Sequence, residues 1–127
     1  MPTVQHMRDV VNQCTAAHSA GDVDAVAALF APDAVVADPV DAPEHVGRDA
    51  VRAFFAGTHE MFDSMDLKAT GAIRAVGNWA AVPLKAVTTM GEMKVQVEII
   101  DVFTFDEDGL IADMRAYWTA EDIRPAD

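Results

Sequence analysis

The segment Met93–Phe105 constrains the fold most, because its residues alternate between an apolar face and a largely polar face. A β-strand directs successive side chains to opposite faces, so this period of two predicts a long strand with one buried face. The apolar face carries Met93, Val95, Val97, Ile99, Asp101, Phe103 and Phe105. A one-residue slip of the strand would bury Lys94, Gln96 and Glu98 instead. Asp101 is therefore predicted to lie in the middle of the most apolar face of the protein.

The rest of the chain has helical patterns first and strand patterns afterwards. Apolar residues at helical spacing predict helices over about residues 7–17, 22–31 and 49–62, with Gly21 ending the first, Asp22 capping the second and Pro32 following it. Strands are predicted at residues 34–38, 65–74, 79–90, 93–105 and 110–118. The last four are joined by the short turns AVGN, GE and DEDG, which suit hairpins. This order predicts an α+β fold, with helices covering one face of an antiparallel sheet.

Length and charge narrow the class of protein. The 127 residues contain no linker-like or repeated segment, so a single domain over residues 1–127 is expected. The net charge of −12 argues against a phosphate-binding surface, and so against nucleic acid or an anionic membrane as partner. A lone cysteine permits no internal disulfide, and no apolar run approaches the ~18 residues of a membrane span. A cytoplasmic protein is expected.

A second acid stands on an apolar face near the middle of the chain. The stretch DAVVADPVDA, residues 33–42, contains a short predicted strand whose last residue is Asp38, directly before Pro39. With a period of two, Ala34, Val36 and Asp38 share one face, so the carboxylate points the same way as the valine. An ionised acid among apolar groups is costly unless it is paired or has a chemical task.

Two inward acids in one small domain suggest two different acidities. A carboxyl group in apolar surroundings has a raised pKa and can stay protonated as a hydrogen-bond donor. One that is partly solvated stays ionised and can act as a base. Asp101, in the middle of its strand, suits the donor role, and Asp38, at a strand end, suits the base. Together they could move a proton beside a carbonyl while the donor stabilises the enolate oxygen.

Other polar residues admit simpler readings. A single inward aspartate is more often structural than catalytic, and the two acids together shift the balance towards a site. Trp118 shares the uncharged face of the last strand, where its N–H needs an acceptor such as Asp38. The four histidines show no metal-ligand spacing, and no phosphate-binding glycine loop is present, so no metal and no cofactor are expected.

Several segments carry a resemblance to a known family: HMRDVVNQC, AGDVDAVAALFAPDAVVADPV, GRDAVRAFF, VEIIDVFTFDEDGLI and MRAYW. They span nearly the whole chain and resemble bacterial ketosteroid isomerase, of the nuclear transport factor 2-like and SnoaL-like superfamily. The resemblance implies a cone-shaped α+β fold, in which a curved antiparallel sheet packs against three N-terminal helices. It also implies a homodimer that isomerises Δ5-3-ketosteroids without a cofactor. Ketosteroid isomerase is itself a known case of a neutral, hydrogen-bond-donating aspartic acid.

The resemblance also implies roles for individual residues. The aspartate before proline, here Asp38, would carry a proton from carbon 4 to carbon 6 through a dienolate. The aspartate after isoleucine in the long strand, here Asp101, would donate to the dienolate oxygen, and Trp118 would support the base. The expected walls for a flat apolar substrate are Phe54, Phe55, Val82, Leu84 and Phe103.

Two positions depart from the family pattern. Cys14 stands where the family has a tyrosine oxyanion donor, and Phe55 stands where it has a supporting tyrosine. A thiol is a short and weak donor, and burial should raise its pKa and leave it inert. Losing one oxyanion donor typically costs ~10²–10³ in rate, so a slower isomerase is expected.

Two other functions stay open. A steroid or polyketide-like ligand could be bound without turnover by the same pocket. An epoxide hydrolase or polyketide cyclase is less favoured, because no inward arginine is found to pair with Asp38. The outward apolar residues Ile100, Val102, Ile111 and Tyr117 would suit a dimer interface, although scattered exposed apolar residues need no partner.

Overall fold

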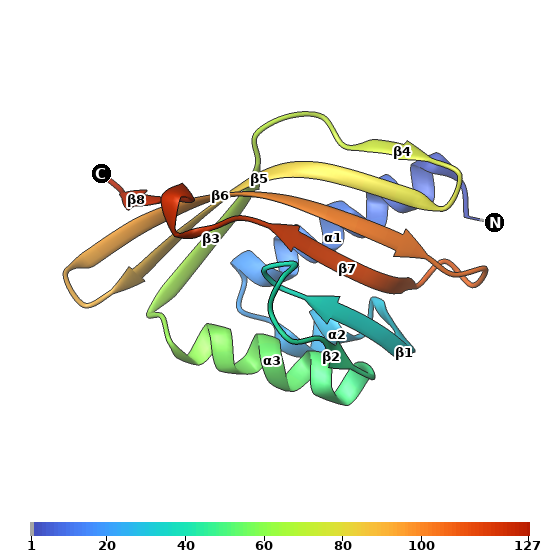
Figure 1. Cartoon of the computed structure of the whole chain (residues 1–127), viewed down its shortest axis with the longest axis horizontal. Helices are drawn as coiled ribbons and strands as arrows, with labels where there is room; N and C mark the ends of the chain where they lie inside the picture. Colours follow the sequence, from blue (N-terminus) through green and yellow to red (C-terminus); the bar gives the residue numbers. More distant parts are fainter. Residues whose placement is uncertain (1) are drawn as a thin grey trace.

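A computed structural model describes residues 2–127 and contains three helices on one face of a curved sheet (Figure 1). The helices are α1 (Val4–Ser19), α2 (Val23–Ala27) and α3 (Arg48–Glu60). The strands are β1 (Phe30–Ala37), β2 (His45–Val46), β3 (Ser64–Ala69), β4 (Arg74–Val76), β5 (Trp79–Met90), β6 (Met93–Phe105), β7 (Ile111–Tyr117) and β8 (Ile123–Pro125), with a short 3-10 helix at Ala120–Asp122. The predicted α+β class is confirmed.

The sheet is mixed. Its strands lie in the order β2-β1-β7-β6-β5-β3, with β4 also paired to β5 and β8 to β6. Neighbours are antiparallel except for β1 and β7, which are parallel. The long hairpin of β5 and β6 has the bounds expected from the sequence, and its unbroken register pairs Val82 with Asp101.

The second helix is shorter than the sequence predicts. Asp22 caps α2 by accepting a hydrogen bond from the Ala25 N–H at 3.0 Å, as expected. The helix nevertheless ends at Ala27, because Phe30 pairs with Ile111 at the start of β1. The strand continues through Pro32, where the register with β7 shifts, and such irregularities tolerate a residue that lacks an N–H.

The strand expected at residues 65–74 is in fact two strands. β3 ends at Ala69 and β4 begins at Arg74, and both pair with β5. The break lies opposite Pro83, which has no N–H to donate; its carbonyl accepts the Thr70 N–H at 2.9 Å. The short elements β2 and β8 and the 3-10 helix were not predicted, since two or three residues give no measurable periodicity.

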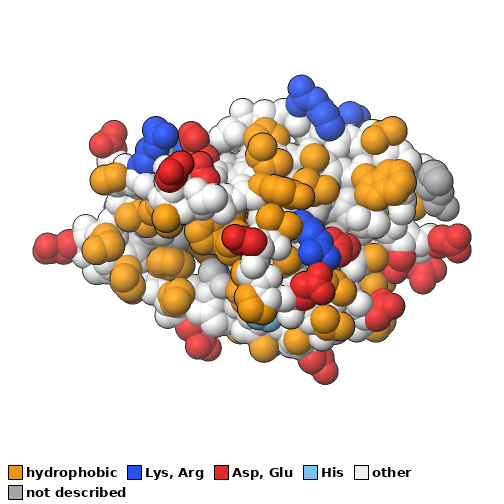
Figure 2. All heavy atoms as spheres, in the orientation of Figure 1, with side chains coloured by type: hydrophobic (Ala, Val, Ile, Leu, Met, Phe, Trp, Pro, Cys, Tyr) orange, Lys and Arg blue, Asp and Glu red, His pale blue; other side chains and the backbone are white. Residues whose placement is uncertain are grey.

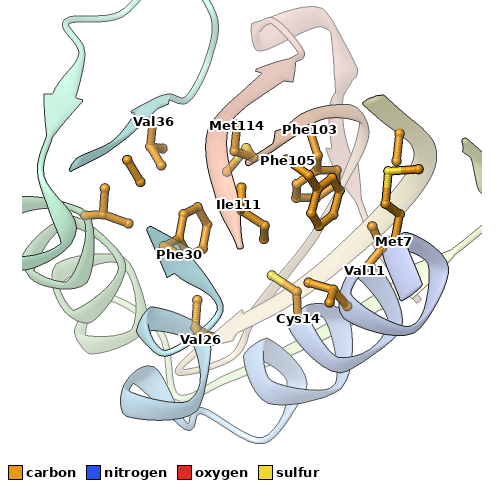
Figure 3. Packing of buried hydrophobic residues seen from close by; sticks show 14 of the residues in the cluster. Met7, Val11, Cys14, Val26, Phe30, Val36, Phe103, Phe105, Ile111 and Met114 are labelled. Atoms are coloured by element: carbon orange, nitrogen blue, oxygen red, sulfur yellow. The ribbon is translucent and has the colours of Figure 1, made fainter. Parts of the chain in front are cut away.

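The core occupies the end of the sheet where β6 finishes (Figure 3). Phe103 and Phe105 of β6 are buried there against Met7 and Val11 of α1. The opposite end of the β5–β6 hairpin extends past the helices, and Met93 is 60% exposed. One face of β6 therefore forms core at one end and is open at the other. Between these ends lies Asp101.

The surface agrees with the acidic composition. On the face that Figure 2 shows, acidic side chains are scattered over the surface, with a few Lys and Arg side chains among them. No helix within residues 2–127 is long and apolar enough to cross a membrane.

Candidate active site

A cavity of about 440 Å³ lies between the inner face of the sheet and the helices α1 and α3. Most of its lining is apolar. Among the predicted site residues, it is lined by Cys14, Asp38, Phe54, Phe55, Asp101, Phe103 and Trp118. Five separate elements or loops thus bring seven predicted residues to one hollow.

Two predicted wall residues do not line this cavity. Val82 and Leu84 are on the inner face of β5, but both are buried in the hydrophobic core. The wall contributed by β5 comes from Ala86 and Thr88, further along the same face. The alternation of β5 gave the correct face, but the sequence could not show where along the strand the core gives way to the cavity.

Asp38, the first residue after β1, is held in place by Trp118, the first residue after β7. The Trp118 indole N–H donates to Asp38 Oδ1 at 2.7 Å, so the predicted pairing of these residues is confirmed. The Asp38–Pro39 peptide bond is cis. Burial raises the pKa of the Asp38 carboxyl above its ordinary value, while the Trp118 hydrogen bond and nearby His45 oppose this rise.

Asp101 lies deeper, at the centre of β6. It pairs with Val82 on one side and Ala116 on the other, and its side chain reaches the cavity. Burial raises its pKa from 3.8 to about 8, and the charge of Asp38 adds to the rise. The two carboxyl groups are therefore close enough to interact, and near neutral pH Asp101 is the one that keeps its proton.

Cys14 faces the same region from α1 (Figure 3). The residue is buried with the core side chains and also lines the cavity. Burial, with a smaller contribution from nearby Asp101, raises the pKa of its thiol from 9.0 to about 12. Cys14 is thus a neutral thiol, as the sequence indicated, and has little nucleophilic character.

Several polar residues of the cavity were not predicted. They are His18, Thr15, Thr58 and Thr88. The sequence held a signal for the first, because His18 is four residues after Cys14 and so lies on the same face of α1. Within residues 2–127, no group of three or more His, Cys, Asp and Glu side chains is arranged to hold a metal ion.

The arrangement can perform general acid–base chemistry on an apolar molecule. The Trp118 indole N–H donates to Asp38 Oδ1, while Asp38 Oδ2 has no hydrogen-bond partner within residues 2–127 and can accept a proton. Asp101 can donate a hydrogen bond to an oxygen that gains charge. A carboxyl group with a free oxygen and a second, protonated carboxyl group thus share one cavity.

Comparisons with known proteins agree with this geometry. Residues 10–114 match the family model described as SnoaL-like domain. The chain is 42% identical to a steroid Delta-isomerase from Nocardioides simplex, over 81% of both proteins. It is also 30% identical to the epoxide hydrolase LasB from Streptomyces lasalocidi, over 99% of this chain but only 47% of that protein.

A solved structure is similar over almost the whole chain. It belongs to SalBIII, described as an epoxide hydrolase/cyclase-like enzyme with a role in pyran ring formation in the polyether salinomycin. The match has a TM-score of 0.90 and 29% sequence identity, and it covers 99% of this chain and 100% of that one.

Proposed function

The chain belongs to the SnoaL-like domain family, and from this premise we propose that it is a cofactor-independent steroid Δ-isomerase. The reaction converts Δ5-3-ketosteroids into Δ4-3-ketosteroids. The proposal rests mainly on Asp38 and Asp101 lining one apolar cavity with their acidities set apart by burial. The 42% identity to a steroid Delta-isomerase supports the same reaction.

The proposed reaction moves one proton within the substrate. Asp38 takes a proton from carbon 4, the C4–H electrons form a C3=C4 bond, and the C3=O π electrons move onto the oxygen. The product of this step is a dienolate in which C3=C4 is conjugated with C5=C6. Asp101 donates a hydrogen bond to the dienolate oxygen, where the negative charge gathers. Asp38 then returns its proton to carbon 6, where the C5=C6 electrons form the new C–H bond. The C3=C4 electrons move to C4=C5 and the C3=O bond is restored, so that the enzyme ends as it began. Trp118 holds the base through one oxygen and leaves the other to carry the proton.

The apolar walls suit a steroid nucleus. The cavity volume of about 440 Å³ lies within the ~300–1,000 Å³ typical of small-molecule sites. Phe54, Phe55 and Phe103 line it together with Val97 and Ile99, and these side chains would bind a flat hydrocarbon mainly by removing its surface from water. Binding of this kind orients the substrate without fixing which steroid it is.

The rate should follow a bell-shaped curve with pH. Asp38 must be ionised to act as a base, so kcat/KM should rise as pH increases through a pKa above 3.8. Asp101 must be protonated to donate, so kcat/KM should fall as pH increases through about 8. Initial rates across this range measure both limbs, which belong to the coupled pair. A flat profile above pH 8 would contradict the donor role.

Position 14 should limit the rate. We expect Cys14→Ala to change kcat little, because a thiol is a weak donor. Cys14→Tyr should raise kcat, because a phenol there could supply a second oxyanion donor, and one such donor is typically worth ~10²–10³. Equal rates for the parent and both variants would show that position 14 has no role. Thermal unfolding of each variant checks that the larger side chain is accommodated.

A second candidate function is opening of an epoxide. The TM-score of 0.90 to an epoxide hydrolase/cyclase-like enzyme favours it, and the same two acids could serve. Asp101 would protonate the epoxide oxygen while Asp38 takes the proton of an attacking hydroxyl group. Within residues 2–127, no arginine lines the cavity to position a water beside Asp38. The structure therefore favours a substrate whose own hydroxyl group attacks the epoxide over attack by a water molecule.

Absorbance of the conjugated enone tests the proposal. Purified protein mixed with a Δ5-3-ketosteroid should produce the conjugated product far faster than buffer alone. Titration with that product, followed by tryptophan fluorescence, measures binding independently of turnover. The two measurements together distinguish an enzyme from a protein that only binds the steroid. Binding without turnover would leave the non-catalytic alternative, and turnover of an epoxide in place of the steroid would favour the second candidate.

A homodimer is proposed on the outer face of the sheet. Ile100 and Tyr117 pair across β6 and β7, and each is 50% exposed. The prediction that Ile111 shares this outward face is wrong, because the register shifts between Thr104 and Phe105 and Ile111 is fully buried in the core. Hydrophobic side chains also lie over β6 and β7 on the face that Figure 2 shows. A second copy packed on this face would cover them. Sedimentation should then give twice the mass of 13.6 kDa, and Tyr117→Asp should return the monomer.

A further inference from the structure

His18 stands where the cavity meets a second hollow. It lines the cavity of the acid pair and also an adjoining hollow of about 290 Å³. The second hollow is more polar, since His59, Ser19, Asp63 and Ser64 contribute to its wall. His18 therefore lies where the wall of the apolar cavity continues into a more polar wall.

The His18 ring is fixed on two sides. Its Nδ1 lies 3.0 Å from Nε2 of His59, and its ring meets that of Phe55 edge-on, with centroids 4.8 Å apart. Its Nε2 has no hydrogen-bond partner within residues 2–127. No fully buried side-chain nitrogen or oxygen in that part of the chain lacks a partner, so Nε2 must be reachable from a hollow.

Strand pairing places this histidine at a distance from the reacting groups. The next residue, Ser19, is hydrogen bonded to Leu67 of β3 through both the N–H and the carbonyl of that residue. Leu67 pairs with Ala86, and Ala86 pairs with Val97. Val97 is four residues before Asp101 on β6, which corresponds to roughly 13 Å of extended strand. The histidine therefore lies nearer than Cys14 to the open end of the cavity, about one helical turn (~5.4 Å) further along α1.

We propose that His18 binds an oxygen at the end of the substrate opposite the ketone that is enolised. The inference rests on the proposed function, and it narrows the substrates to steroids with a hydrogen-bonding group on the distal ring. Burial and the neighbouring His59 lower the pKa of His18 to about 4, so the ring is neutral in use. In the proposed arrangement His59 donates to Nδ1, so that Nε2 of the neutral His18 ring carries the proton and donates it to a ketone.

The test compares two Δ5-3-ketosteroids that differ only at carbon 17, one with a ketone there and one with a CH₂ group. We expect the parent protein to favour the ketone about tenfold in kcat/KM, mostly through KM, because a net hydrogen bond is worth about that factor. His18→Phe keeps the ring contact with Phe55 and should remove the preference. The readout is the ratio of kcat/KM for the two substrates, and thermal unfolding checks that the variant is folded.

Two amide variants sharpen the result. His18→Gln places an amide near the position of Nε2 and should retain part of the preference. His18→Asn places its amide near Nδ1, so it should retain the His59 contact and lose the preference. A parent without preference, or a preference that survives His18→Phe, would overturn the inference.

Failure of the proposed function gives a different result. If neither steroid is isomerised, the isomerase proposal fails, but the two conjugated products can still be titrated by tryptophan fluorescence. Tighter binding of the product with the 17-ketone by the parent, abolished in His18→Phe, would uphold the binding role of His18. Equal binding of both products would refute it.

Discussion

Asp38→Asn should lower kcat by about 10²–10⁴-fold, the usual contribution of a general base. An amide cannot accept the proton from carbon 4, so the chemical step loses its base. The amide oxygen can still accept the 2.7 Å hydrogen bond from Trp118, so the loop should keep its position. Initial rates at saturating steroid, followed by enone absorbance, give the change.

A matched variant separates charge from position. Asp41 lies three residues further along the same loop and is exposed. Asp41→Asn removes the same charge and should leave the rate unchanged. Asp38→Asn should also bind the conjugated product as the parent does. A rate for Asp38→Asn close to the parental rate would refute the assignment of the base.

Asp101→Leu should lower kcat by about 10²–10³-fold, the typical cost of losing one oxyanion donor. The loss in kcat should be about 10³-fold, because the Cys14 thiol is a weak hydrogen-bond donor and does not replace Asp101. Asp101→Asn should lose less, because its amide N–H can still donate. Since an amide does not titrate, the fall in rate above a pH of about 8 should disappear in this variant.

The control for this pair of variants lies on the same strand. Glu98 is exposed on the outer face of β6, three residues from Asp101. Glu98→Gln should leave both the rate and its pH profile unchanged. Equal losses in Asp101→Leu and Asp101→Asn would show that the site needs the carboxyl group for something other than donating a hydrogen bond.

The inner face of β6 was predictable because strand alternation is a local property. Placing Asp101 inward required only a period of two and the cost of burying Lys94 instead. The Trp118–Asp38 hydrogen bond followed from an indole that needs an acceptor. These predictions depend on strand alternation and on the hydrogen-bonding needs of single side chains, both of which can be read from the sequence.

Other features depend on contacts between distant segments. The helical pattern continues through Phe30, but pairing with Ile111 makes that residue start a strand. The boundary that puts Leu84 in the core and Ala86 in the cavity wall depends on how far the helices extend over the sheet. The partnership of His18 and His59 joins two helices, and no spacing within either helix could indicate it.

The most direct measurement follows a deuterium label placed at carbon 4 of the steroid, with the protein in ordinary water. If Asp38 carries the proton inside an apolar cavity, most of the product should retain the label at carbon 6, as mass and position analysis would show. Product that has exchanged its label completely would contradict transfer by one sheltered base. It would then call for a solvent-exposed base or a second proton donor in the reaction.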